Sequence, residues 1–206
     1  MSPRQVENMR ALVLANPKPT KRSLLGTEDE AKHIIDNFPG SKAYLRSDAT
    51  LETFKENASR FSILHLGTHG CFDPNGCEDL GMEPNTILFA NNEQYDISRA
   101  EQELIFRNTD ILILSACQTV KETNADGKEF SGLAYVLERA GAKTVIGGLW
   151  NVDDKPSAKI MNEFYTNLKQ GMSKSEAMQK AKISHLKTGE KINPHFWSPF
   201  ILIGNN

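Results

Sequence analysis

The chain has 206 residues, of which 39% are apolar and 24% are charged, and its formal net charge is −2. This composition is typical of a globular protein, and the length suits one α/β domain with a substantial core. The charge argues against direct nucleic-acid binding, and no apolar run approaches the roughly 20 residues of a membrane span. The first residues, MSPRQVENMR, lack the apolar stretch of a signal peptide. We therefore expect a cytoplasmic protein without a membrane partner.

Strand-like and helix-like segments alternate along the first half of the chain. Apolar runs predict strands, and 3.6-residue periodicity predicts helices. Thr27 with Glu30 has the spacing of a capping box at the start of a helix, and Thr50 is the expected cap of the next one. The expected strands are 9–17, 41–47 and 61–70, and the expected helices are 27–38 and 50–60.

The middle of the chain is rich in turn-forming residues. Residues 71–85 are dense in Gly, Pro, Asn and Asp and predict an exposed loop. Residues 86–98 predict a hairpin that turns at Asn91–Asn92, and a short helix should follow at 98–106.

The second half returns to the alternating pattern. A buried strand is expected within 110–119, and a polar loop should follow it at 119–129. Ser173 with Glu176 forms a second capping-box pattern. The alternation predicts βαβ units, a mainly parallel sheet flanked by helices and one compact domain over residues 1–206. The further strands are 142–152 and 196–206, and the further helices are 130–141, 156–171 and 173–187.

Two of the predicted strands end in reactive side chains. Residues 61–70 end in His69 and Gly70, and the next buried strand leads to Ser115, Ala116 and Cys117. The carboxyl ends of neighbouring parallel strands open onto one crevice, where ligands usually bind. A histidine beside a cysteine in such a crevice is a general base next to a thiol nucleophile. The backbone N–H groups of Gly70 and Cys117 are candidates for stabilising an oxyanion.

The residues alone leave a structural alternative open. A lone cysteine in a strand is usually a small apolar filler, and a lone histidine near a strand end is often a hydrogen-bonded structural residue. His65 competes with His69 for the role of base. Because His65 lies inside the strand, we expect it to be buried and hydrogen-bonded.

Cys71 and Cys77 flank the start of the expected loop. Three cysteines cannot all pair within one chain, so we expect free thiols, exposed at these two positions, in a reducing cytosol. With His69 they form the pattern His-x-Cys-x₅-Cys, whose three donors and spacing do not suit a structural zinc site. No glycine-rich nucleotide-binding motif follows the first strand. We therefore expect neither a metal nor an organic cofactor.

Four ordered motifs carry a resemblance to a known family. The segments HLGTHG, LSACQT, GLAYVLERAGAKTVIGGLWNVDD and HFWSPFILIG resemble the CHAT-domain family of caspase-like cysteine peptidases, which is grouped with caspases, gingipains, clostripain and separase. The resemblance implies a caspase–hemoglobinase-like three-layer sandwich. It also implies that His69 is the catalytic histidine, Cys117 the nucleophile and Gly70 the oxyanion-hole glycine. Gly67 and Val120 depart from the family pattern, which commonly has Ala and Gly there.

The same resemblance points to a substrate pocket. Trp150 to Asp154 follow a buried strand, and a similar segment of separase supplies an acidic residue to the first specificity pocket. Carried over by position, that residue is Asp154, with Asp153 as its neighbour. Trp150 is expected to be a packing residue or a wall of the pocket, and Ser115 to contact the substrate. A carboxylate there would favour substrates with Arg or Lys before the cut bond. The alternative is that Asp153 or Asp154 caps the helix that follows.

Together these features predict a cysteine endopeptidase that cleaves protein or peptide substrates through a thioester. The family resemblance implies gating by a sensing domain, such as tetratricopeptide repeats, or by an activating partner, and the chain would then be the C-terminal part of a longer protein. Two alternatives remain open. One is a catalytically silent protein-interaction module on the same fold, and the other is a different amide or thioester hydrolase.

Overall fold

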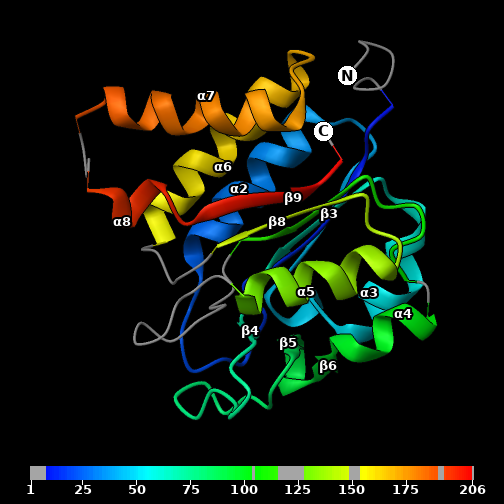
Figure 1. The fold of residues 1–206 in the computed structure, drawn as a ribbon. Helices are drawn as coiled ribbons and strands as arrows, with labels where there is room; N and C mark the ends of the chain where they lie inside the picture. Colours follow the sequence, from blue (N-terminus) through cyan, green and yellow to red (C-terminus); the bar gives the residue numbers. More distant parts are fainter. Residues whose placement is uncertain (1–7, 104, 116–127, 149–153, 190–192, 206) are drawn as a thin grey trace.

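The computed structural model describes residues 8–103, 105–115, 128–148, 154–189 and 193–205. This part of the chain is built around a six-stranded sheet with the order β2-β1-β3-β7-β8-β9 (Figure 1). Five neighbouring strands are parallel, and β9 pairs antiparallel with β8 at one edge. The strands are β1 (Ala11–Ala15), β2 (Lys42–Leu45), β3 (Ile63–Gly67), β7 (Ile111–Leu114), β8 (Thr144–Gly148) and β9 (Phe200–Gly204).

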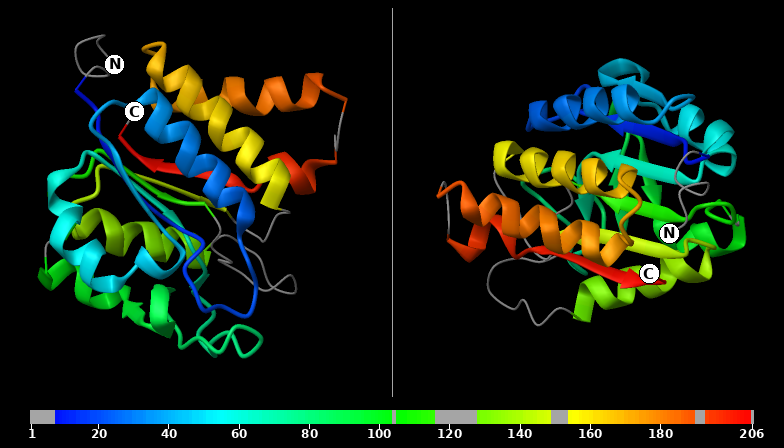
Figure 2. Two further views of the ribbon diagram at one scale, coloured as in Figure 1. Left: turned by 180° about the vertical axis from the view of Figure 1, so that it is seen from behind. Right: turned by 90° about the horizontal axis from the view of Figure 1, so that it is seen from above.

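Helices cover both faces of this sheet, which gives three layers (Figure 2). One layer contains α2 (Leu25–Asn37), α6 (Asp154–Lys169), α7 (Lys174–Lys187) and α8 (Pro194–Trp197). The other contains α3 (Leu51–Asn57), α4 (Ala100–Glu103) and α5 (Lys128–Arg139). The predicted α/β architecture, with a mainly parallel sheet between helices, is confirmed. Short 3₁₀ turns occur at Arg46–Asp48, Ala58–Arg60, Ala90–Asn92 and Ile97–Arg99.

Alternation along the central strands divides the core into two clusters. Leu64 and Leu66 of β3 face α3 and α5, whereas Ile63 faces α2 and α6. Successive side chains of a strand point to opposite faces of the sheet. His65 therefore lies on the same face as Ile63, beneath α2 and α6. His65 lies in the middle of β3, four residues before His69, which follows the end of the strand.

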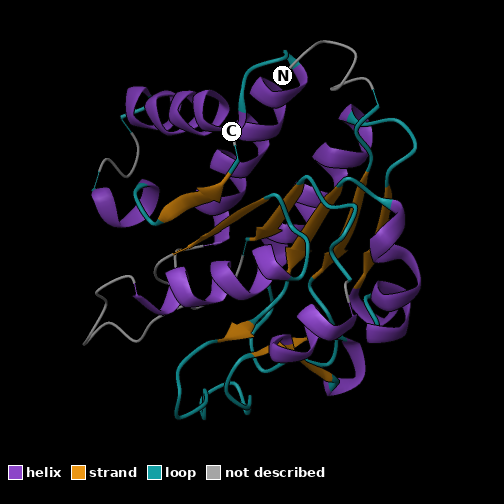
Figure 3. Ribbon diagram, turned by 45° about the vertical axis from the view of Figure 1, so that its right-hand side comes forward, coloured by secondary structure: helices purple, strands orange, loops and turns teal. Residues whose placement is uncertain are grey.

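A second, three-stranded antiparallel sheet follows His69 (Figure 3). It consists of β4 (Gly70–Cys71), β5 (Thr86–Leu88) and β6 (Gln94–Asp96). The predicted hairpin over residues 86–98 is confirmed. Asn91 and Asn92 have φ angles of 61° and 60°, and asparagine tolerates this left-handed conformation better than most residues do.

The helix starts confirm two of the three predicted caps. The hydroxyl of Thr50 accepts from the N–H of Thr53, and Ser173 with Glu176 forms both bonds of a capping box. The capping box predicted at Thr27 and Glu30 is wrong. There α2 begins at Leu25, the hydroxyl of Thr27 donates to the carbonyl of Leu24, and Glu30 is buried against His65. The Glu30 carboxylate therefore faces the buried His65 and not the helix start.

Candidate active site

The strands that lead to His69 and Cys117 are neighbours in the sheet. Strands β3 and β7 run parallel, with Leu66 opposite Leu114, and the N–H of Ser115 donates to the carbonyl of Leu66 at 3.2 Å. Both strands therefore end at the same edge of the sheet, as predicted. His69 lies two residues beyond the end of β3 and is 5% exposed.

Part of the predicted site lies outside the described residues. Cys117, Trp150 and Asp153 belong to these stretches. Asp154 is the first residue of α6, and its side chain is likewise not described. The roles assigned to these four residues therefore stay predictions.

The ring of His69 is held by a main-chain acceptor. Its Nε2 lies 2.8 Å from the carbonyl oxygen of Arg22. A carbonyl oxygen can only accept, so Nε2 carries the proton and Nδ1 of the neutral ring keeps its lone pair. Burial is the main cause that lowers the pKa of His69 below 6.5, and the Arg22 carbonyl partly opposes this shift. At neutral pH the ring is therefore suited to accept a proton at Nδ1.

The main chain on either side of this imidazole is anchored in the small sheet. The carbonyl of His69 accepts from the N–H of Leu88 at 2.9 Å, and the hydroxyl of Thr68 donates to the carbonyl of Leu88. Gly70 opens β4 opposite Ile87 and is buried. The β5 strand thus fixes the direction in which the chain leaves β3.

Ser115 is the described residue next to the predicted nucleophile. It is 8% exposed, and its hydroxyl oxygen has no hydrogen-bond partner among the described residues. A buried hydroxyl without a partner is costly, and such groups often lie near functional sites. Its contact with substrate stays a prediction.

His65 is a structural residue, as predicted. It is fully buried, and its Nδ1 lies 3.0 Å from the hydroxyl of Tyr165. On the other side of the ring, Nε2 lies 2.6 Å from Oε2 of Glu30, although the orientation does not meet hydrogen-bond geometry. Burial and the nearby Glu30 carboxylate raise the pKa of Tyr165 well above its usual value. This cluster joins β3 to α2 and α6, away from the strand end.

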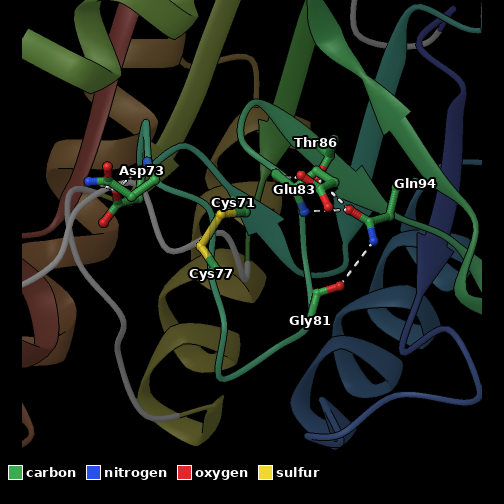
Figure 4. Close-up of a disulfide and its surroundings, with 8 residues drawn as sticks. Cys71, Asp73, Cys77, Gly81, Glu83, Thr86 and Gln94 are labelled. Carbon is green, nitrogen blue, oxygen red and sulfur yellow. Dashed lines mark hydrogen bonds between the residues drawn. A yellow bond between two sulfur atoms is a disulfide. The ribbon is translucent and has the colours of Figure 1, made fainter.

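The expectation of exposed free thiols at Cys71 and Cys77 is wrong. The two cysteines form a disulfide and are 0% and 6% exposed (Figure 4). The segment after Cys77 folds back through a bridge from Cys77 to Met82, and Gln94 bonds to Gly81 and Glu83. Local folding of the loop brings the two sulfurs together, which spacing alone does not reveal. Because disulfides occur mainly in oxidising compartments, the cysteines no longer support a cytosolic location.

Comparison with known proteins places this arrangement in a family. The model of the CHAT domain matches residues 1–205. The chain belongs to the CHAT domain family. Tetratricopeptide repeat protein 28 of Homo sapiens and of Mus musculus are each 25% identical to this CHAT domain over 234 aligned residues. The alignments cover 95% of the chain but only 9% and 10% of those proteins, so the chain spans about a tenth of its curated relatives.

Solved structures share the fold of this CHAT domain. The Arg-specific cysteine proteinase gingipain R matches with a TM-score of 0.64 and 10% identity, over 100% of this chain and 48% of its own. Separase, in the Saccharomyces cerevisiae separase–securin complex, matches with a TM-score of 0.58 and 16% identity, over 97% of this chain and 12% of its own. The predicted caspase-like fold is confirmed. Within the described part of the chain, no helix combines the length and apolar character of a membrane span.

Proposed function

We propose that this CHAT domain is a cysteine endopeptidase, with His69 as the general base and Cys117 as the nucleophile. One observation carries the proposal. In the β3–β7 pair Leu66 lies opposite Leu114, and His69 and Cys117 each follow that pair by three residues. Two segments that leave neighbouring parallel strands at the same offset start out along the same edge, where active sites of such sheets are found. The fold shared with the cysteine proteinase gingipain R supports this assignment.

The tautomer of His69 supports a definite sequence of proton transfers. Nδ1 takes the thiol proton, and the thiolate attacks the carbonyl carbon of the scissile bond. The N–H groups of Gly70 and Cys117 stabilise the resulting oxyanion. The imidazolium gives its proton to the leaving amine as the C–N bond breaks and a thioester forms. Water, deprotonated by His69, then releases the acid and restores the thiol, without any metal or organic cofactor.

The proposed substrate is a protein or peptide held beside this edge of the sheet. Asp154, Asp153 and Trp150 would form the pocket for the residue before the cut bond, and Ser115 would contact the substrate next to Cys117. Because α6 begins at Asp154, a capping role for this carboxylate remains the alternative.

We also propose that a regulatory repeat domain or an activating partner gates the activity. The name of the curated relatives, tetratricopeptide repeat protein 28, and the small share of them that this chain spans support this idea. A cytoplasmic location stays part of the proposal. The Cys71–Cys77 disulfide argues against a cytoplasmic location, because the cytosol keeps most thiols reduced.

Thiol alkylation tests the proposed pair directly. The chain has three cysteines, and two are joined in the disulfide, so Cys117 is the expected target of iodoacetamide without reductant. We expect rapid labelling of Cys117 at pH 7, which His69→Gln slows and Cys117→Ala abolishes. Cys117 labelling that proceeds at the rate of a free thiol and is indifferent to His69→Gln would favour a silent interaction module.

Peptide cleavage then tests the chemistry and the pocket. A fluorogenic panel with Arg, Lys, Asp or Leu before the cut bond should show preference for the basic residues. Asp154→Ala should remove this preference, whereas unchanged selectivity with lower thermal stability would assign Asp154 to the helix start. Cleavage that survives Cys117→Ala would refute the mechanism and favour a different hydrolase.

A further inference from the structure

Asn16 is a buried polar residue that the proposed reaction does not use. It follows β1 directly, is 0% exposed and has a left-handed φ of 49°. Its N–H donates to the carbonyl of Gly67 at 2.9 Å. Gly67 is the last residue of β3, two positions before His69. The main chain of Asn16 is therefore tied to the end of the strand that carries the base.

The side chain of Asn16 holds the other partner of this histidine. Its Oδ1 accepts from the N–H of Leu24 at 2.9 Å and from the hydroxyl of Ser23 at 3.4 Å. These residues directly follow Arg22, whose carbonyl accepts from Nε2 of His69. Asn16 thus closes the loop over residues 17–23 from one end to the other. Asn16 therefore holds both the strand that leads to His69, whose Nε2 donates, and the loop whose Arg22 carbonyl accepts.

A salt bridge determines which way the Asn16 amide faces. Its Nδ2 donates to Oε1 of Glu28 at 2.5 Å, and Arg46 donates to both carboxylate oxygens of Glu28 at 2.8 and 2.9 Å. The hydrogen bond from Arg46 is the main cause that keeps the pKa of Glu28 below its usual value. A carboxylate can only accept, so the NH₂ group must face Glu28 and Oδ1 must face Leu24. The amide cannot turn over without losing both contacts.

We infer that Asn16 is a positioning residue for His69: by clamping the loop at Leu24 it holds the Arg22 carbonyl where Nε2 donates, which directs the lone pair to Nδ1. The inference about the tautomer stands on these contacts alone, and its catalytic consequence rests on the proposed function. A loosened loop would let the imidazole turn or exchange tautomers. A base displaced by about 1 Å can lower a rate by roughly 100-fold.

The decisive variant is Asn16→Asp. Aspartate tolerates the left-handed backbone, so the substitution changes the side-chain chemistry without adding the strain that alanine would add. It places a second carboxylate against that of Glu28, and the repulsion between the two should drive the side chain at position 16 away from the Leu24 N–H and so release the clamp. The double variant Asn16→Asp/Glu28→Gln should restore the contact with donor and acceptor exchanged. A matched control is Asn57→Asp, because Asn57 is also buried, donates to the carbonyl of Thr53 and lies in α3.

The first readout is the His69 tautomer, observed in long-range ¹H–¹⁵N spectra of histidine-labelled protein with His69→Gln for assignment. We expect a neutral ring protonated at Nε2 in the wild type, mixed tautomers in Asn16→Asp, recovery in the double variant and no change in Asn57→Asp. The second readout is alkylation of Cys117 at pH 7, which should fall on the order of 10- to 100-fold in Asn16→Asp and recover with the tautomer.

An unchanged tautomer in folded Asn16→Asp, or an equal change in Asn57→Asp, would overturn the inference. If Asn16→Asp does not fold, Glu28→Ala replaces it, because it removes the partner of Nδ2 from a more exposed position and should shift the tautomer in the same direction. A tautomer that responds as expected while wild-type Cys117 is unreactive would support the positioning role and refute the peptidase proposal.

Discussion

Gly67 is the position where a single methyl group tests the packing beneath the site. A Cβ atom added there would lie 2.6 Å from Cβ, 3.0 Å from Cγ2 and 3.1 Å from Oγ1 of Thr27. Carbon atoms in contact normally lie about 3.5–4.0 Å apart. Thr27 is 1% exposed in the first turn of α2, and Gly67 ends a central strand. Neither partner can move without shifting the helix or the strand.

The expected cost of Gly67→Ala follows from this contact. Overpacking a close-packed core costs typically about 1–3 kcal/mol. The lower backbone entropy of alanine in the unfolded chain returns roughly 0.5–1 kcal/mol. Because the 2.6 Å contact with Cβ of Thr27 is far inside normal contact distance, we take the upper part of the packing cost, about 2–3 kcal/mol. The expected net loss is then about 1–2.5 kcal/mol in the free energy of unfolding, which corresponds to a fall of about 2–10 °C in Tm for a chain of this size.

Thermal unfolding followed by circular dichroism measures this loss in three backgrounds. The first atom that the new methyl meets is Cβ of Thr27. Thr27→Ala keeps that atom, so Gly67→Ala should remain destabilising there, whereas in Thr27→Gly the penalty should disappear. An equal penalty in the glycine and alanine backgrounds, or no penalty in the wild type, would refute the steric argument. If the steric argument holds, CHAT sequences with alanine at the position of Gly67 should have a smaller residue than Thr27, or a larger spacing, opposite it.

Two further outcomes follow from the disulfide and from the buried imidazole. Closing a loop with a separation of six residues predicts that loss of the Cys71–Cys77 bond lowers the free energy of unfolding by about 2 kcal/mol. Reductant should lower Tm in the wild type but not in Cys71→Ser/Cys77→Ser, and equal responses would contradict this. Because the folded pKa of His69 is lowered, its contribution is present above pH 6.5 and is lost as the pH falls below it. Urea unfolding from pH 7 to 5 should show a shallower decline for His69→Gln, although His33 contributes in the same direction, and an unchanged decline would contradict it.

The sequence predicted those features that depend on local patterns. Thr50 and Ser173 were recognisable as caps because they precede exposed helix starts, where only nearby backbone groups compete for the hydroxyl. The hairpin at Asn91 was recognisable because its turn requires residues that tolerate positive φ. The edge where His69 emerges followed from alternating strands and helices.

The features that the sequence could not predict depend on contacts between distant segments. Glu30 has the spacing of a capping residue, and only the position of β3 beneath α2 turns it toward His65. Cys71 and Cys77 pair because the chain between them folds so that their Cα atoms lie 5.8 Å apart. The acceptor for His69 is a carbonyl of the main chain, which every residue type has and which therefore leaves no mark in the sequence.

Because the acceptor for His69 is a main-chain carbonyl, a substitution at position 22 can change the side-chain charge without changing the hydrogen-bond acceptor. The hydrogen bond to His69 uses the backbone of Arg22, while the guanidinium side chain of this residue is exposed. Position 22 can therefore carry a positive, neutral or negative group and still present the same oxygen to the imidazole. Besides burial, the Arg22 charge is one of the causes that lower the pKa of His69, so a substitution at this position should change that pKa while the hydrogen bond to Nε2 stays in place.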